Sequence, residues 1–116
     1  MGSKWVMLMG SALFAALPLA AHHSLEAEYD PTQTVTLKGT VTKMDWSNPH
    51  VRMFLNVMDV NRNVNWQVEM GSPNAQLLEG WKIDTLKPGD HVVVSVYRAR
   101  NGSNIGFARK ITKNNP

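Results

Sequence analysis

The amino-acid sequence predicts an all-β domain with one short helix, preceded by a signal peptide. Four stretches of the chain alternate apolar and polar residues with a period of two, which is typical of half-buried strands, and a fifth stretch is rich in valine, which is typical of a buried strand. A short segment between Pro73 and Gly80 carries the start and stop signals of a helix. The first 21 residues combine a basic start, an apolar run and small residues at the end, as secretory signals do.

The composition limits the protein to one small domain. Removing 21 residues from a chain of 116 leaves 95 residues, enough for a single hydrophobic core. Apolar residues at 43% and charged residues at 18% exclude a collagen-like, coiled-coil or wholly disordered chain. Without Lys4 the chain has 11 basic and 9 acidic residues, so its net charge of about +2 does not indicate nucleic-acid binding. The absence of cysteine excludes disulfides, thiolate metal sites and a cysteine nucleophile.

Residues 1–21 are expected to be the signal peptide. Lys4 is followed by an uncharged apolar run that ends in Ala20 and Ala21. Cleavage after Ala21 makes His22 the first mature residue, and cleavage after Ala20 is the alternative. We therefore expect a periplasmic or secreted protein with no stable membrane span after cleavage. A retained N-terminal anchor is the competing interpretation.

The mature chain is expected to begin with an arm over residues 22–33, which is polar and follows neither a strand nor a helix period. A half-buried strand starts at Thr34. Its alternation slips before Met44, which predicts a β-bulge near Thr42 and Lys43. Gly39 offers the same strand a second place to bend.

The next two strands are expected to pair as a hairpin. Residues 51–60 and 64–70 both alternate apolar and polar side chains. Residues 61–63 supply the turn between them. Together with the strand before them, they predict a three-stranded meander.

A helix of about two turns is expected after the meander. Ser72 is a suitable N-cap, Pro73 fits the first helical position and Gly80 fits the exit. The side that we expect to be buried carries Leu77, Leu78 and Trp81.

Two further strands complete the domain. Residues 87–90 place Pro and Gly at the centre of a type II turn, and residues 91–99 are rich in valine, as a buried strand requires. After a turn at residues 101–102, the last strand carries Ile105, Phe107 and Ile111. The order β-β-β-α-β-β with a long, bent first strand predicts an OB-like five-stranded barrel over residues 34–113. A two-sheet sandwich is the competing arrangement.

Several separated motifs resemble one family of small exported bacterial proteins, the domain of unknown function 6152 family. The motifs are His22-His23-Ser24, residues 37–41, residues 46–51 (WSNPHV), residues 69–74 (EMGSPN) and residues 86–90 (LKPGD). The resemblance covers nearly the whole mature chain. It implies export and a small β-barrel, and it carries no assigned activity.

The N-terminal histidines predict a copper(II) site. A free amino group beside an imidazole is a chelate, and nitrogen ligands favour Cu(II), so His22 and His23 resemble the start of a histidine brace. Cleavage after Ala20 would instead place a histidine third, which resembles the amino-terminal copper and nickel motif. His50 and His91 are the candidates for additional ligands. The alternative is that both are ordinary turn and strand-end residues.

A second hypothesis is a ligand- or protein-binding OB module without a metal. One candidate surface is the barrel face around Arg52 and Phe54. The other is the basic region of the last two strands, where Arg98 and Arg100 would recognise an anionic partner. Its partner would be an unknown small ligand or protein, and nucleic acid is not expected. Because no nucleophile, base and orienting acid can be grouped from the sequence, we expect a non-enzymatic module.

Overall fold

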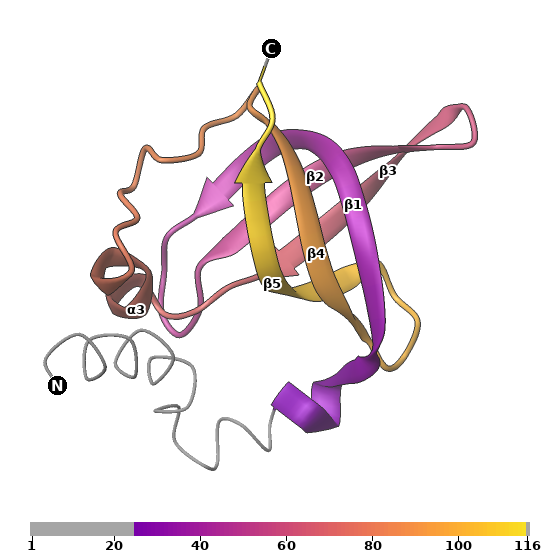
Figure 1. The fold of residues 1–116 in the computed structure, drawn as a ribbon, viewed down its shortest axis with the longest axis horizontal. Coiled ribbons are helices and arrows are strands. Elements are labelled where there is room, and N and C mark those ends of the chain that lie inside the picture. Colours follow the sequence, from indigo (N-terminus) through magenta and orange to yellow (C-terminus); the bar gives the residue numbers. More distant parts are fainter. Residues whose placement is uncertain (1–24, 116) are drawn as a thin grey trace, which may run out of the picture.

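The computed structural model describes residues 25–115, which form a closed five-stranded barrel with strand order β1-β2-β3-β5-β4 (Figure 1). The expected OB-like fold is confirmed, and the strands close into a barrel rather than a two-sheet sandwich. Within the described residues, no helix has the length and apolar character needed to cross a bilayer. The elements are β1 (Tyr29–Asp45), β2 (Arg52–Asp59), β3 (Arg62–Glu69), α3 (Pro73–Leu78), β4 (His91–Ala99) and β5 (Ile105–Lys113).

The long strand β1 closes the barrel because it pairs with two neighbours. Its first part pairs antiparallel with β4, and its last part pairs antiparallel with β2. The predicted bulge is present between Val41 and Lys43. Gly39 lies where both pairings meet, and a Cβ atom there would come within 2.5 Å of the Asn56 carbonyl oxygen. Glycine therefore lets β1 lie close to β2 at the bend.

Strand β1 starts at Tyr29, five residues earlier than the alternation predicts. Residues 29–33 therefore extend the strand instead of belonging to a free arm, and Tyr29 pairs with Ala99 of β4. The cause is a tertiary contact, because the Tyr29 ring is buried against Phe107. A single turn of helix over residues 25–28 precedes the strand.

The hairpin between β2 and β3 turns one residue earlier than expected. Val60 and Asn61 both have positive φ angles, of 44° and 67°, as the tight primed turns of hairpins require. Asp59 and Arg62 form the last cross-strand pair before this turn.

Helix α3 has the predicted caps but buries a different side chain. The Ser72 hydroxyl accepts a hydrogen bond from the Ala75 amide, and Gly80 has a positive φ of 97°. Leu77 and Leu78 are 51% and 68% exposed, so the prediction that they face the core is wrong. The buried residue is Gln76, whose side-chain oxygen accepts a hydrogen bond from the Gly71 amide. Each helical residue turns by about 100°, so a helix that directs Gln76 inward directs the two leucines away.

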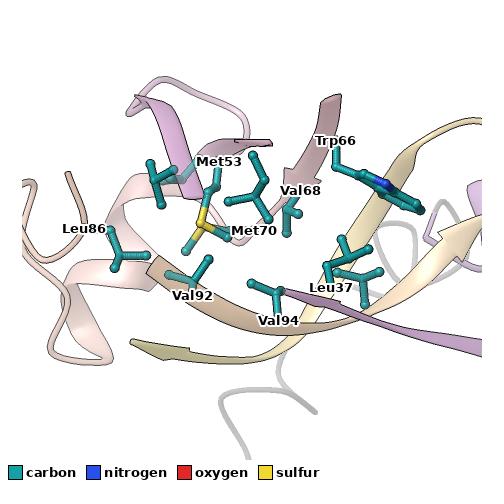
Figure 2. Packing of buried hydrophobic residues seen from close by; sticks show 12 residues of the cluster. Leu37, Met53, Trp66, Val68, Met70, Leu86, Val92 and Val94 are labelled. Carbon is teal, nitrogen blue, oxygen red and sulfur yellow. The ribbon is translucent and has the colours of Figure 1, made fainter. Parts of the chain in front are cut away.

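The main hydrophobic core fills the barrel interior (Figure 2). Alternate residues of each strand contribute to it, as expected for a closed sheet. Trp66 belongs to this core, and the partly buried Trp46 and Trp81 pack against it. A second, smaller cluster comprises Tyr29, Ala99 and Phe107, against which Leu25, Tyr97 and Ile105 pack. The second cluster attaches the start of the described chain to β4 and β5.

Asp90 fixes the type II turn that leads into β4. Its carboxylate accepts hydrogen bonds from the Asn115 side chain at 3.0 Å and from the Lys87 amide at 2.9 Å, and it lies 3.5 Å from the Lys113 ammonium group. The Asn115 hydrogen bond is the largest cause that lowers the pKa of Asp90 from 3.8 to about 2.

This contact predicts a specific loss of stability in acid. A carboxyl whose pKa is lower in the folded state stabilises the fold above its unfolded pKa and loses that contribution as the pH falls through its folded pKa. We expect thermal melts to show a steeper fall in the melting temperature between about pH 4 and pH 2 for the wild type than for Asp90→Asn. Parallel pH profiles for the two proteins would contradict this role.

Candidate metal centre

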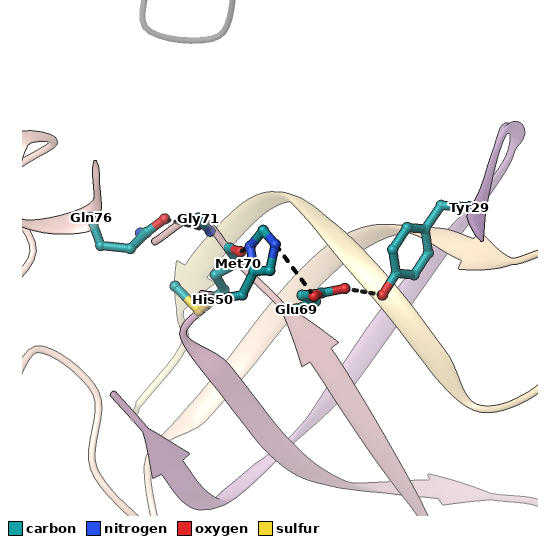
Figure 3. Close-up of polar contacts among 6 residues, drawn as sticks. All are labelled: Tyr29, His50, Glu69, Met70, Gly71 and Gln76. Carbon is teal, nitrogen blue, oxygen red and sulfur yellow. Dashed lines mark hydrogen bonds and ion pairs between the residues drawn. The ribbon is translucent and has the colours of Figure 1, made fainter. Parts of the chain in front are cut away.

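His50 is held by one ring nitrogen and presents the other to a buried carboxylate (Figure 3). It lies in the loop between β1 and β2, after Pro49. Its Nδ1 atom lies 2.9 Å from the Met70 carbonyl oxygen. Because a carbonyl oxygen only accepts hydrogen bonds, Nδ1 carries the proton and donates it. In the neutral ring, Nε2 then has a free lone pair, and it lies 3.7 Å from Glu69 Oε1.

Glu69, the last residue of β3, supplies that carboxylate and is only 8% exposed. Its Oε2 atom accepts a hydrogen bond from the Tyr29 hydroxyl. Burial, followed by the hydrogen bond to Glu69, raises the pKa of Tyr29 far above its ordinary value, so the phenol stays protonated and remains a donor. Tyr29 thereby occupies one carboxylate oxygen and leaves the other towards His50.

Arg52 adds a positive charge beside this group. It is the cross-strand neighbour of Glu69 on β2, and its charge opposes the rise in the pKa of Tyr29. The Arg52 Nε atom is buried and has no hydrogen-bond partner within residues 25–115. Of the predicted ligand-binding residues, Arg52 thus lies at the His50–Glu69 pair. Phe54 lies two residues further along β2, with the Lys43 ammonium group 5.5 Å from its ring centre.

The separation between His50 Nε2 and Glu69 Oε1 suits a bridging cation better than a direct bond. A distance of 3.7 Å exceeds that of a hydrogen bond. Metal–nitrogen and metal–oxygen bonds of about 2.0–2.2 Å would together span it, so one ion could contact both atoms. Within the described part of the chain, no group of three or more histidine and acidic side chains is arranged to hold a metal. The His50–Glu69 pair therefore supplies two metal ligands and needs further ligands to complete a site.

The four predicted metal-binding histidines are not all brought together. His91 begins β4 and pairs with Thr40, whose hydroxyl lies 3.1 Å from its Nδ1. Phe107 is the cross-strand partner of both Glu69 and Tyr97, so Tyr97 lies at the same end of the barrel as Glu69. His91 is six residues away from Tyr97 along β4. At about 3.3 Å per residue, this places His91 about 20 Å from the His50 end of the barrel. His22 and His23 lie outside the described residues.

Arg98 and Arg100 make internal contacts. The Arg98 guanidinium group lies 5.1 Å from the Trp66 ring centre and donates a hydrogen bond of 2.9 Å to the Gly102 carbonyl oxygen. Arg100 Nε donates to the Glu26 carbonyl oxygen at 2.7 Å. Both arginines therefore hold chain segments in place, a role that needs no anionic ligand.

Tyr29 and Glu69 are the site residues that sequence reasoning missed. Glu69 follows the strand alternation as an ordinary outward-facing residue, and nothing in its sequence neighbourhood reveals that it is buried. Tyr29 did leave a signal, since it is an aromatic residue in a mostly polar stretch. Such a residue in a supposed arm indicates a docked segment.

The strand order, with helix α3 between β3 and β4, defines a small OB-like barrel protein. Two crystal forms of Rim1, a mitochondrial single-stranded DNA binding protein from S. cerevisiae, are similar in structure, each with a TM-score of 0.53. The first is 9% identical and covers 70% of this chain and 92% of Rim1; the second is 11% identical and covers 72% and 97%. Identities this low show a shared fold alone.

The family is shown by the sequence. The chain belongs to the family described as a family of unknown function (DUF6152), whose model matches residues 11–109. The resemblance found from the motifs is thereby confirmed. Comparison with curated proteins finds no match.

Proposed function

We propose that this protein is an exported accessory module that binds Cu(II). His50 Nε2 and Glu69 Oε1 supply two ligands, and His22 and His23 supply the others after signal cleavage in the periplasm or outside the cell. The observation that carries the proposal is the His50–Glu69 pair, because its Nδ1 hydrogen bond aims the free nitrogen at a buried carboxylate 3.7 Å away.

The start of the described chain supports a contribution from the N-terminal histidines. Leu25 packs against the cluster that contains Phe107, and Phe107 is the cross-strand neighbour of Glu69. His23 and His22 precede Leu25 by two and three residues, which span up to about 7 and 11 Å of extended chain. This short length of chain supports the proposal that both imidazole groups contribute to the site.

The donor set favours copper over the common alternatives. Imidazole and amine nitrogens bind Cu(II) more tightly than the other divalent first-row metals. A single carboxylate is a poor basis for Ca²⁺ or Mg²⁺, which require several oxygen ligands. The chain has no cysteine to favour a thiolate site.

The first test combines intact-mass analysis with Cu(II) titration of protein exported by a bacterial host. We expect a mature chain that begins at His22 and binds one Cu(II) ion. His22→Ala should weaken that binding by at least about tenfold, because it removes a ligand. Ser24→Ala is the control and should match the wild type. A retained Met1, or an unchanged affinity of His22→Ala, would refute the proposal.

A further inference from the structure

We infer that residues 25–29, named here the N-terminal strap, position the metal ligands, and that Tyr29 and Arg100 are the positioning residues that dock it. The inference rests on the proposed function and adds a regulatory element to the same site. Binding of the ion and docking of the strap would stabilise one another.

Apolar contacts dock both ends of the strap. Leu25 packs against the second cluster, and Tyr29 is a buried member of it. The Tyr29 and Phe107 ring centres lie 5.8 Å apart with the rings tilted by 50°, an arrangement that favours aromatic pairs. These contacts seat the strap on β4 and β5.

Arg100 secures the strap between those ends. Its Nε donates to the Glu26 carbonyl oxygen at 2.7 Å, and its backbone amide donates to the Glu28 carbonyl oxygen at 2.9 Å. The guanidinium hydrogen bond depends on the side chain, whereas the amide hydrogen bond does not. A side-chain substitution therefore removes one attachment and leaves the other.

Tyr29 connects the strap to the metal ligands. Its hydroxyl donates to Glu69 Oε2, while Glu69 Oε1 faces His50 Nε2 (Figure 3). A hydrogen bond to the far oxygen of a ligating carboxylate sets its orientation, and the loss of such a partner typically weakens metal binding about 10- to 100-fold. Release of the strap would remove this hydrogen bond.

Docking of the strap and binding of Cu(II) are therefore linked. If docking of the strap raises the affinity for Cu(II) by some factor, then bound Cu(II) favours docking by the same factor. The strap would stay on the barrel while the ion is bound, and a partner that pulled the strap away would release the ion.

The test compares Tyr29→Phe with Tyr97→Phe. Tyr97 is the chain's other tyrosine and also packs against the second cluster, so its variant loses a hydroxyl without touching Glu69. We expect Tyr29→Phe to bind Cu(II) at least about tenfold more weakly and to change the Cu(II) electron paramagnetic resonance spectrum. Tyr97→Phe should keep the wild-type spectrum and an affinity within about twofold.

Arg100→Gln provides a second variant, which leaves the buried Tyr29 phenol in place, and Arg62→Gln, at the exposed start of β3, is its control. Hydrogen exchange of residues 25–33 should be faster in Arg100→Gln than in the control, and in the wild type it should slow when Cu(II) is added. If the wild type binds Cu(II) but Tyr29→Phe keeps its affinity and spectrum, the inference is overturned and the proposed function stands. If the wild type binds no Cu(II), the proposed function itself fails, and the inference fails with it.

Discussion

Replacing His50 with asparagine should weaken Cu(II) binding by about 100-fold or more, since it removes a direct ligand where the loss of a supporting partner alone costs about 10- to 100-fold. An asparagine amide can still donate to the Met70 carbonyl oxygen, as Nδ1 does at 2.9 Å. The asparagine side chain has no atom that replaces His50 Nε2 as a metal ligand. The substitution therefore separates metal binding from the hydrogen bond that holds the loop, and competition titration against a chelator of known affinity measures the difference.

His91→Asn is the matched control for that experiment. His91 lies at the end of β4 that is remote from His50, beside Thr40. Its backbone amide donates a hydrogen bond to the Asn115 side chain at 2.7 Å. We expect an affinity for Cu(II) within about twofold of the wild type, as for a residue that does not touch the site. A loss of affinity in His91→Asn that equals the loss in His50→Asn would show that the ion is bound elsewhere or without specificity.

The position of the candidate site agrees with the way in which OB-like barrels present ligands. Their usual binding surface involves the second and third strands together with the loops that join strands one to two and four to five. His50 comes from the first of these loops, Glu69 from the end of β3, and Arg100 from the start of the loop after β4. The barrel thus brings together groups that are far apart in the sequence.

Most of the fold follows from local sequence signals. The valine-rich run, together with the Pro-Gly turn at residues 88–89, is enough to locate β4, and the slip before Met44 is enough to locate the bulge. Leu77 and Leu78 show the limit of this reasoning. Both are apolar, but a six-residue helix can bury only one narrow side, and the hydrogen bond between Gln76 and Gly71 selects that side.

The candidate site was harder to predict because it depends on contacts between distant segments. The sequence singled out His50 by its residue type and its place in a turn, and Arg52 by its place on the expected barrel face. The sequence alone could not decide which of His50 and His91 lies beside Glu69, because the answer depends on the end of the barrel at which each histidine lies. Glu69 and Tyr29 are 40 residues apart, and the burial of each depends on the other. Pairing of this kind leaves no periodic pattern in a single sequence.

Met53→Ala should destabilise the barrel by about 2–5 kcal/mol, the usual cost of truncating a fully buried long side chain to a methyl group. Met53 is 0% exposed and lies among the core residues drawn in Figure 2. Domains of this size are stable by about 5–15 kcal/mol, so the loss would be a large fraction of the total. Urea unfolding monitored by tryptophan fluorescence gives the free energy of unfolding.

Met58→Ala makes the same chemical change on the same strand and provides the comparison. Met58 is 66% exposed and pairs with Asn63 beside the hairpin turn, so its truncation should change the free energy of unfolding by no more than about 0.5 kcal/mol. The two positions are five residues apart, and an odd spacing on a regular strand places side chains on opposite faces. The contrast between the variants therefore tests the register of β2, which also sets Arg52 opposite Glu69. A reversed contrast, with the larger loss in Met58→Ala, would mean that β2 is shifted by one residue, because such a shift moves every side chain to the opposite face, and the candidate metal centre would then lose its geometry.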